Sequence, residues 1–247
     1  MRIALLALIA TLSACTPDTP AAPAAGIDKS PRSRVLETGA MTLQGSGPVG
    51  RLDIHLIGFH PLKDDPQQQM EAHHYCRQVN EEFAQCALFD SDAADARLTG
   101  IEYLISGRLF GRLPADERRY WHPHNGEILS GQLSAPNLPL PAERALMRSK
   151  MNSYGKTWHL WHDGQELPLG DPKLAWSFNR GGEIDPALVA ARDRAGMIST
   201  DQRRRDRESL RALARPQFGV DALREAFPQA TPWPGVVDAE PLQGPVD

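Results

Sequence analysis

Short runs of β-branched, aromatic and aliphatic residues recur through the middle of the chain, each bounded by turn-forming residues. Runs of this kind are typical of β-strands. Helix signals alternate irregularly with them. This mixture predicts a single α+β domain in which helices pack against an antiparallel or mixed sheet. The predicted strands are 51–58, 86–90, 98–106, 127–133, 157–162 and 174–178.

The longest predicted helix covers residues 66–86. Its apolar positions recur at spacings of four, three, four and three residues, which is a helical period. Cys76 and Cys86 would then lie about 15 Å apart along the helix axis, beyond the roughly 7 Å between Cα atoms that a disulfide can span. We therefore expect two buried, unpaired thiols. The positions that set the period are Ala72, Cys76, Val79, Phe83 and Cys86.

Four further helices are predicted from signals at their ends. Gly155 is a residue type that favours helix C-caps, and proline after Asp185 suits a first turn. Ser199, with a glutamine three residues later, resembles a capping box. The predicted helices cover about 114–121, 142–154, a segment from 185 onward, and a segment from 199 to 215.

The first residues have the pattern of a signal peptide. One positive charge, Arg2, precedes about ten apolar residues (3–12), and small residues follow. As a helix the apolar run would span about 15 Å, half of the roughly 30 Å hydrocarbon core of a bilayer. A permanent transmembrane helix is therefore not expected.

Residues 12–15, Leu-Ser-Ala-Cys, resemble the lipobox of bacterial lipoproteins. The resemblance implies that the signal peptide (1–14) is cleaved and that Cys15 is lipidated and N-acylated, and two or more acyl chains anchor a protein stably. Thr16 in place of aspartate resembles the signal for sorting to the outer membrane. We expect a lipid-anchored bacterial cell-envelope protein on the outer membrane, facing the periplasm. The alternative is an ordinary secretory signal with an incidental cysteine.

Two proline-rich stretches flank the predicted domain. Residues 15–34 contain almost no large apolar side chain, so they cannot bury a core and are expected to form a disordered, semi-extended tether. Residues 228–247 contain five prolines and are expected to form an irregular tail. The folded domain is therefore placed at 35–227.

Composition and motifs exclude several classes of protein. The 247 residues are 41% hydrophobic and 23% charged, with a net charge of −4. These values do not fit a membrane-spanning bundle, a fully disordered chain or a basic nucleic-acid binder, so no nucleic-acid partner is expected. Residues 45–50 match the glycine spacing of dinucleotide-binding turns. They precede a strand and contain Pro48, so we discount the match.

Histidine is the residue type that suggests chemistry, because neutral imidazole is a common metal ligand and general base. On the predicted helix, Glu71 and His74 share a face, whereas His73 points about 100° away from His74. A divalent metal site is one hypothesis, and core histidines held by hydrogen bonds are the alternative. The residues of the candidate metal site are Glu71, His74, His122, His124 and His159.

Two other catalytic classes have weaker support. A catalytic Cys76 would need an activating base, yet a thiol on an apolar helix face has a raised pKa. A hydrolase with paired carboxylates would use acids that are also ordinary on protein surfaces. The acids concerned are Glu71, Glu81, Glu82, Asp90, Asp92 and Glu102.

Ordered blocks of residues, of which Glu-Ala-His-His-Tyr-Cys at 71–76 is the most specific, resemble the oil body-associated protein family. In bacteria and fungi that family is a domain of unknown function. The resemblance covers about 54–215. Plant members are associated with seed oil bodies, which implies a lipid-surface connection, and the family implies no reaction. The blocks are 58–60, 63–66, 71–76, 80–83, 85–86, 90–92, 96–98, 100–103 and 152–159.

These observations predict a non-enzymatic, lipid-anchored envelope protein whose domain binds or organises a lipid or envelope component. The membrane is its expected partner, through Cys15. The alternative is a metal-dependent enzyme, such as a hydrolase, that uses a Glu/His site with a divalent metal as its cofactor. The expected polar or ligand-binding site comprises Glu71, His73, His74 and Tyr75.

Overall fold

The computed structural model describes residues 25–162 and 164–239. The predicted signal peptide (1–14), Cys15, part of the tether and the end of the tail lie outside the described residues. Among the residues described, no helix combines the length and apolar character needed to cross a membrane.

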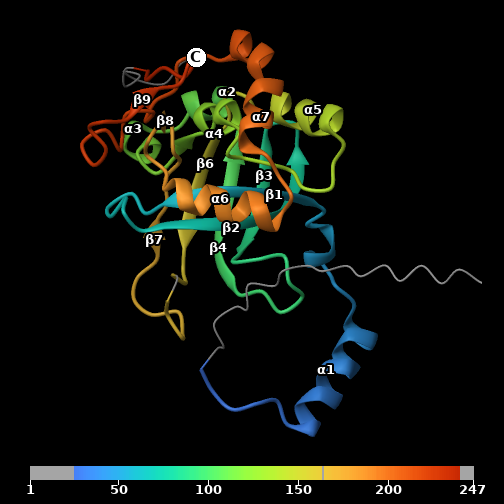
Figure 1. Cartoon of the computed structure of the whole chain (residues 1–247). Helices are drawn as coiled ribbons and strands as arrows, with labels where there is room; N and C mark the ends of the chain where they lie inside the picture. The colour runs from blue at the N-terminus through green and yellow to red at the C-terminus, as the bar shows by residue number, and fades with distance from the viewer. Residues whose placement is uncertain (1–24, 163, 240–247) are drawn as a thin grey trace, which may run out of the picture.

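An antiparallel sheet of seven strands forms the centre of the fold (Figure 1). The first four strands form a meander. β4 then pairs with β6, which also pairs with the two short strands β5 and β7. The predicted α+β class is confirmed. The strands are β1 Ile54–Pro61, β2 Gln69–Asn80, β3 Phe83–Phe89, β4 Leu98–Ile105, β5 His122–Pro123, β6 Tyr154–His159 and β7 Lys173–Leu174.

The sheet curls so that its first strand approaches its last ones. Leu62, directly after β1, forms a bridge with Ala175, directly after β7. The backbone N–H of Trp176 donates to the carbonyl of Pro61 at 2.9 Å. The curl gives the sheet an inner face on which side chains from distant strands meet.

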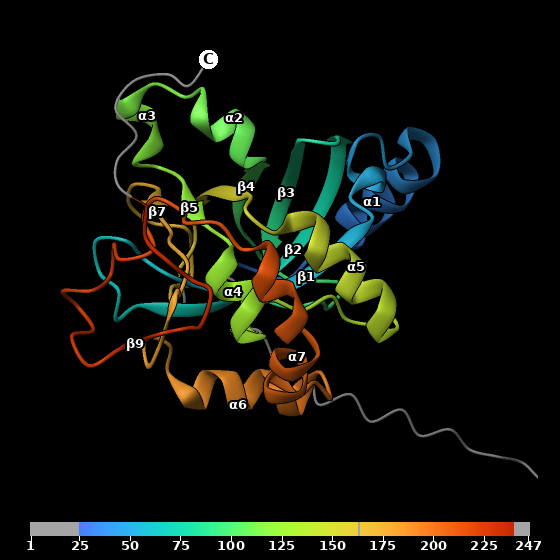
Figure 2. The same ribbon diagram turned by 90° about the horizontal axis from the view of Figure 1, so that it is seen from above.

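Helices lie around the curled sheet (Figure 2). α6 packs against β1 and β2, where the Arg192 guanidinium lies 4.8 Å from the centre of the Phe59 ring. α1 stands apart from the sheet (Figure 1), and none of its side chains is buried. The helices are α1 Pro31–Gln44, α2 Gly107–Gly111, α3 Ala115–Arg118, α4 Asn125–Ser130, α5 Leu140–Lys150, α6 Pro186–Ala195 and α7 Thr200–Asp206, with 3₁₀ turns Val49–Arg51 and Glu208–Leu213 and a minor sheet of β8 Arg180–Gly181 and β9 Thr231–Pro232.

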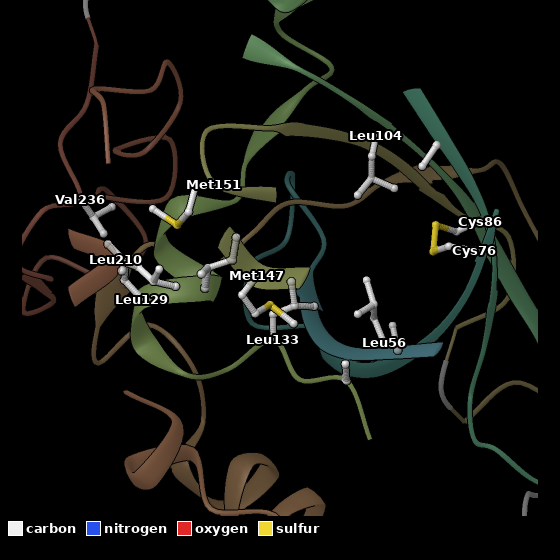
Figure 3. Close-up of a cluster of buried hydrophobic side chains, with 14 of the residues drawn as sticks. Leu56, Cys76, Cys86, Leu104, Leu129, Leu133, Met147, Met151, Leu210 and Val236 are labelled. Atoms are coloured by element: carbon white, nitrogen blue, oxygen red, sulfur yellow. A yellow bond between two sulfur atoms is a disulfide. The ribbon is translucent and has the colours of Figure 1, made fainter. Parts of the chain in front are cut away.

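The main hydrophobic core lies between the inner face of the sheet and the helices α4 and α5. Every second residue of β3 is buried, as strand geometry requires when one face is covered. Val236, from the predicted tail, also belongs to this core. The side chains labelled in Figure 3 are Leu56, Cys76, Cys86, Leu104, Leu129, Leu133, Met147, Met151, Leu210 and Val236.

The predicted helix over 66–86 is wrong. The segment forms β2 and the start of β3, joined by a tight turn. Ala72 and Cys76 are an even number of residues apart, so a strand also places them on one face, and both are buried. Val79, which a helical period places in the core, is 43% exposed. The steps of three residues, 76 to 79 and 83 to 86, each lie within one strand and join residues on opposite faces, and the step from 79 to 83 crosses the turn.

The prediction of unpaired thiols is therefore also wrong. Antiparallel pairing places Cys76 directly opposite Cys86, and the two form a disulfide. Residues far apart along a helix axis become nearest neighbours once the chain reverses direction. Figure 3 shows this disulfide at the edge of the core.

Other local predictions divide between confirmed and wrong. Strands near β1, β3, β4 and β6 are confirmed, as are helices after Asp185 and Ser199, whose side chains accept from the backbone N–H groups of Ala187 and Gln202. The predicted strand 127–133 is wrong, because the segment contains α4. All six residues of α4 are buried, so no polar face reveals a helical period. The predicted C-cap Gly155 instead lies within β6.

Candidate metal centre

A glutamate lies at the centre of the inner face of the sheet. On β4, Glu102 and Leu104 point inward, while Ile101 and Tyr103 point to solvent. Glu102 is only 3% exposed. A carboxylate at such a position is costly unless positive charge or hydrogen-bond donors surround it.

Three histidines from three other segments surround this carboxylate. His74, from β2, places Nε2 at 3.1 Å from Glu102 Oε2. His122 (β5) and His124 (directly before α4) place Nε2 at 3.5 and 3.4 Å from Glu102 Oε1. All three imidazoles are buried. The strand order explains the convergence, because β5 and β4 are both neighbours of β6.

A second pair of histidines completes the cluster. His60 Nδ1, from β1, lies 3.0 Å from His159 Nε2, at the end of β6. The His60 ring packs edge-on against that of His74, with 5.0 Å between ring centres. The closure of the curled sheet brings these two end strands together. We call Glu102, His60, His74, His122, His124 and His159 the inner cluster.

Hydrogen bonds fix the tautomer of His124. The hydroxyl of Ser153 donates its single proton to the carbonyl of Lys150 at 2.7 Å. Ser153 Oγ must therefore accept from His124 Nδ1, which lies 2.7 Å away. The Nε2 atom of a neutral His124 then carries a lone pair, and this lone pair faces the carboxylate of Glu102. Either a metal ion or a proton between the nitrogen and the carboxylate oxygen would hold the two atoms at their separation of 3.4 Å.

Other nitrogens in the cluster also lack partners. Within the described part of the chain, neither ring nitrogen of His122 has a hydrogen-bond partner, and neither does His74 Nδ1. Buried polar atoms nearly always have a partner. Unpartnered imidazole nitrogens beside a carboxylate are donor atoms of the kind that bind a metal ion.

Burial sets the protonation of the cluster. Desolvation, together with the neighbouring histidines, lowers the pKa of His122 to about 3 and that of His60 well below its usual range. Burial alone would raise the pKa of Glu102, but the imidazoles of His124, His74 and His122 that face it bring this pKa well below its usual range. Neutral imidazoles at His60 and His122 beside an ionised Glu102 are in the protonation state that binds a metal.

The spacing of the donor atoms suits a small cation. Metal–nitrogen and metal–oxygen bonds near 2.0–2.2 Å give tetrahedral ligand–ligand edges of about 3.3 Å. The edges from Glu102 Oε1 to His122 and His124 are 3.5 and 3.4 Å. Two overlapping groups of mutually close donor atoms share the carboxylate: His60, His74 and Glu102, and Glu102, His122 and His124.

A cavity of about 20 Å³ adjoins the cluster, large enough for one ion or water molecule. Glu127, from α4, also lines it, and burial together with the charge of Glu102 raises the pKa of Glu127 well above its usual range. Lys150 and Leu104 line both this cavity and a larger cleft of about 390 Å³. The inner cluster is therefore one layer of side chains away from the cleft.

Gly155 of β6 makes room for the cluster. A Cβ at this position would lie 2.6 Å from Nε2 of His122, and closer still to Oε1 of Glu102. Real Cβ contacts are longer than this, so only glycine leaves His122 and Glu102 where they are.

The structure separates the predicted site residues into two groups. His74, His122 and His124 meet around Glu102, and His159 joins them through His60. Glu71 does not join them, because β2 is a strand and Glu71 lies on its opposite face. Glu71 and His74 would share a face only if residues 66–86 formed a helix, so this prediction is wrong for the same reason as the helix.

The other face of β2 carries a second polar group. His73 Nε2 lies 3.1 Å from Glu71 Oε1, and His73 Nδ1 lies 3.1 Å from His55 Nε2. Tyr75 stacks on His55 with 4.5 Å between ring centres. The expected polar site of Glu71, His73, His74 and Tyr75 is thus divided, with His74 alone on the inner face.

The sequence does not single out Glu102, His60 or Glu127 as members of one site. The sequence feature that could have identified Glu102 is its place as the lone acid in the apolar run 98–105. A charge at an inward position of a strand needs a partner, but the sequence does not show which residues supply it.

The fold and the inner cluster define a small α+β domain with a buried histidine–glutamate centre. The family described as "Protein of unknown function (DUF1264)" matches residues 46–211, and the chain belongs to this family.

Plant relatives cover most of the chain. Oil body-associated protein 2A of Zea mays is 36% identical over 219 residues, which are 82% of this chain and 87% of the relative. Oil body-associated protein 1B of Arabidopsis thaliana is 34% identical over 191 residues, 76% of this chain and 78% of the relative. Oil body-associated protein 1A of Zea mays is 36% identical over 194 residues, 78% and 80% of the two chains. No solved structure matches the chain.

Proposed function

We propose that this chain binds one divalent transition-metal ion at the inner cluster, with Glu102, His122 and His124 as ligands. The observation that carries the proposal is the position of His124 Nε2, 3.4 Å from Glu102 Oε1, in a ring whose Nδ1 is held by the hydroxyl of Ser153. Imidazole and carboxylate donors suit ions such as Zn²⁺ or Fe²⁺.

Metal content of the purified protein tests this function. The full chain is purified without affinity tag or chelator, and its metal is measured by plasma mass spectrometry beside Glu102→Gln and His124→Ala variants. We expect about one ion per chain, lost in both variants. The control is His55→Ala, which removes a histidine on the opposite side of the sheet and should keep the ion. A folded protein that carries no metal and takes up no Zn²⁺ in equilibrium dialysis would refute the proposal.

We also propose that a lipidated Cys15 carries this domain at a membrane surface as part of a bacterial cell envelope, where it binds or organises a lipid or envelope component. The lipobox-like sequence at 12–15 supports the anchor. α1 adds exposed Val35, Leu36 and Leu43 between anchor and domain. Relatives named oil body-associated proteins are consistent with a lipid surface. Mass spectrometry of the N-terminal peptide should find acyl chains on Cys15, and Cys15→Ser should release the protein from the membrane fraction. An unmodified Cys15 in membrane-bound protein would contradict the anchor.

A hydrolytic enzyme is the second candidate, and Glu127 is the observation that favours it. Glu127 lines the small cavity beside the cluster, and its raised pKa favours the protonated carboxyl, which can donate a proton to the leaving group of a bound ester as a general acid. The test uses p-nitrophenyl esters of short fatty acids as probes. Glu127→Gln should abolish hydrolysis while metal content stays at the level of the unsubstituted protein. Equal hydrolysis by both proteins would remove this candidate.

A further inference from the structure

The disulfide lies in the same row of the sheet as the carboxylate of the inner cluster. Cys76 of β2 is opposite Cys86 of β3, and Cys86 is in turn opposite Glu102 of β4. All three side chains are buried on the inner face. The disulfide therefore lies beside the proposed ligand Glu102, on the two strands that precede β4.

One of the two sulfurs is better placed to reach an ion. Cys76 follows His74 by two residues, so both side chains lie on the same face of β2. The small cavity is lined by Cys76 together with His74, Glu102 and His124. Cys86 is not among the described residues that line it.

We propose that Cys76 is a latent metal ligand, which becomes available to the inner cluster when the Cys76–Cys86 disulfide is reduced. The proposal rests on the metal function proposed above and adds a ligand to the same site. In the oxidised chain the centre offers only nitrogen and oxygen donors. In the reduced chain it also offers sulfur, which favours Zn²⁺ and softer ions such as Cu⁺.

The chemistry requires a dithiol as reductant. The dithiol transfers two electrons and two protons, the Cys76–Cys86 S–S bond breaks, two S–H bonds form, and the reductant closes as its own disulfide. When the ion binds, the Cys76 thiol releases its proton to solvent and its sulfur bonds to the metal. Cys86 remains a thiol.

Cobalt absorption tests the proposal, because a Co²⁺–thiolate bond gives a near-ultraviolet charge-transfer band that nitrogen and oxygen ligands do not. The full chain carries Cys15→Ser in every sample, so only the two core cysteines can supply sulfur. Co²⁺ is added to the oxidised protein, to protein reduced with dithiothreitol and then freed of it without oxygen, and to two single variants. Cys86→Ser releases the Cys76 thiol without reductant, and Cys76→Ser releases only Cys86.

We expect Co²⁺ to bind all four samples, with the thiolate band in the reduced protein and in Cys86→Ser only. Bound Co²⁺ without this band in Cys86→Ser would overturn the proposal, and so would an equal band in Cys76→Ser. Cys86→Ala, checked for fold by circular dichroism, replaces Cys86→Ser if that variant unfolds. Visible d–d absorption reports bound Co²⁺ independently of sulfur. Its absence from every folded sample would refute the metal function itself, whereas its presence without the thiolate band refutes only the role of Cys76.

Discussion

Gly155→Ala should damage the inner cluster through one added methyl group. The Cβ would lie 2.6 and 2.7 Å from Nε2 and Cε1 of His122 and closer still to Glu102, whereas ordinary contacts are near 3.5 Å. His122 or Glu102 must therefore move by roughly 1 Å. The shift breaks the donor spacing that a metal needs, and overpacking of this kind costs about 1–3 kcal/mol.

Urea unfolding and Co²⁺ titration measure the two effects of Gly155→Ala. We expect the free energy of unfolding to fall by about 1–3 kcal/mol and the affinity for Co²⁺ to fall at least tenfold. Gly111→Ala is the matched control, since its Cβ would meet no atom within 4 Å, and it should change stability by less than about 0.5 kcal/mol. If Gly155→Ala binds Co²⁺ as tightly as the unsubstituted protein, the donor geometry described above is not the one that binds metal.

Three further predictions follow from the structure. Reducing the disulfide, which links residues 10 apart in sequence, should lower the free energy of unfolding by about 2.7 kcal/mol in metal-free protein, and an unchanged urea midpoint would contradict this. Burial holds the pKa of His122 and His159 at about 3, so between pH 6.5 and 3 the unfolded chain binds protons that the folded chain does not. The free energy of unfolding should therefore fall by about 2 kcal/mol per histidine as the pH drops from 7 to 5. Glu127, whose pKa is raised, acts in the opposite direction. A urea midpoint that rises toward pH 5 would show that the histidines are not the dominant groups. The double variant Leu36→Asp and Leu43→Asp should reduce co-sedimentation with anionic vesicles. Its thermal midpoint should stay unchanged, because α1 buries no side chain. A large loss of stability would show that α1 packs on the domain.

The sequence predicts a strand or helix correctly where the spacing of its buried residues fits only one kind of element. β3 and β4 are short runs with turn residues at both ends, and their alternation reports the face that is buried. β2 was mistaken for a helix because Ala72 and Cys76 satisfy both periods. Nothing local distinguishes the two, since the deciding fact is that Cys86 returns to pair with Cys76.

The candidate site was predictable by residue type and not by geometry. His74, His122 and His124 stand out because imidazole is a common ligand. Glu102 looks like any surface acid until the sheet curls and places it among them. Conversely, Glu71 was paired with His74 only because the wrong element was assumed.

The closure of the sheet dictates when a metal can be acquired. The donors of the inner cluster come from positions 60 to 159, and β1 and β6 meet only after the whole meander has formed. Contacts between residues so far apart form late in folding, because the long loop must close first. Before the sheet closes, a nascent chain therefore lacks the full donor set of this centre. If the signal peptide directs an unfolded chain across a membrane, the protein must take its ion from the compartment into which it emerges. The metal supply of that compartment, rather than that of the cytoplasm, then decides which ion the protein carries.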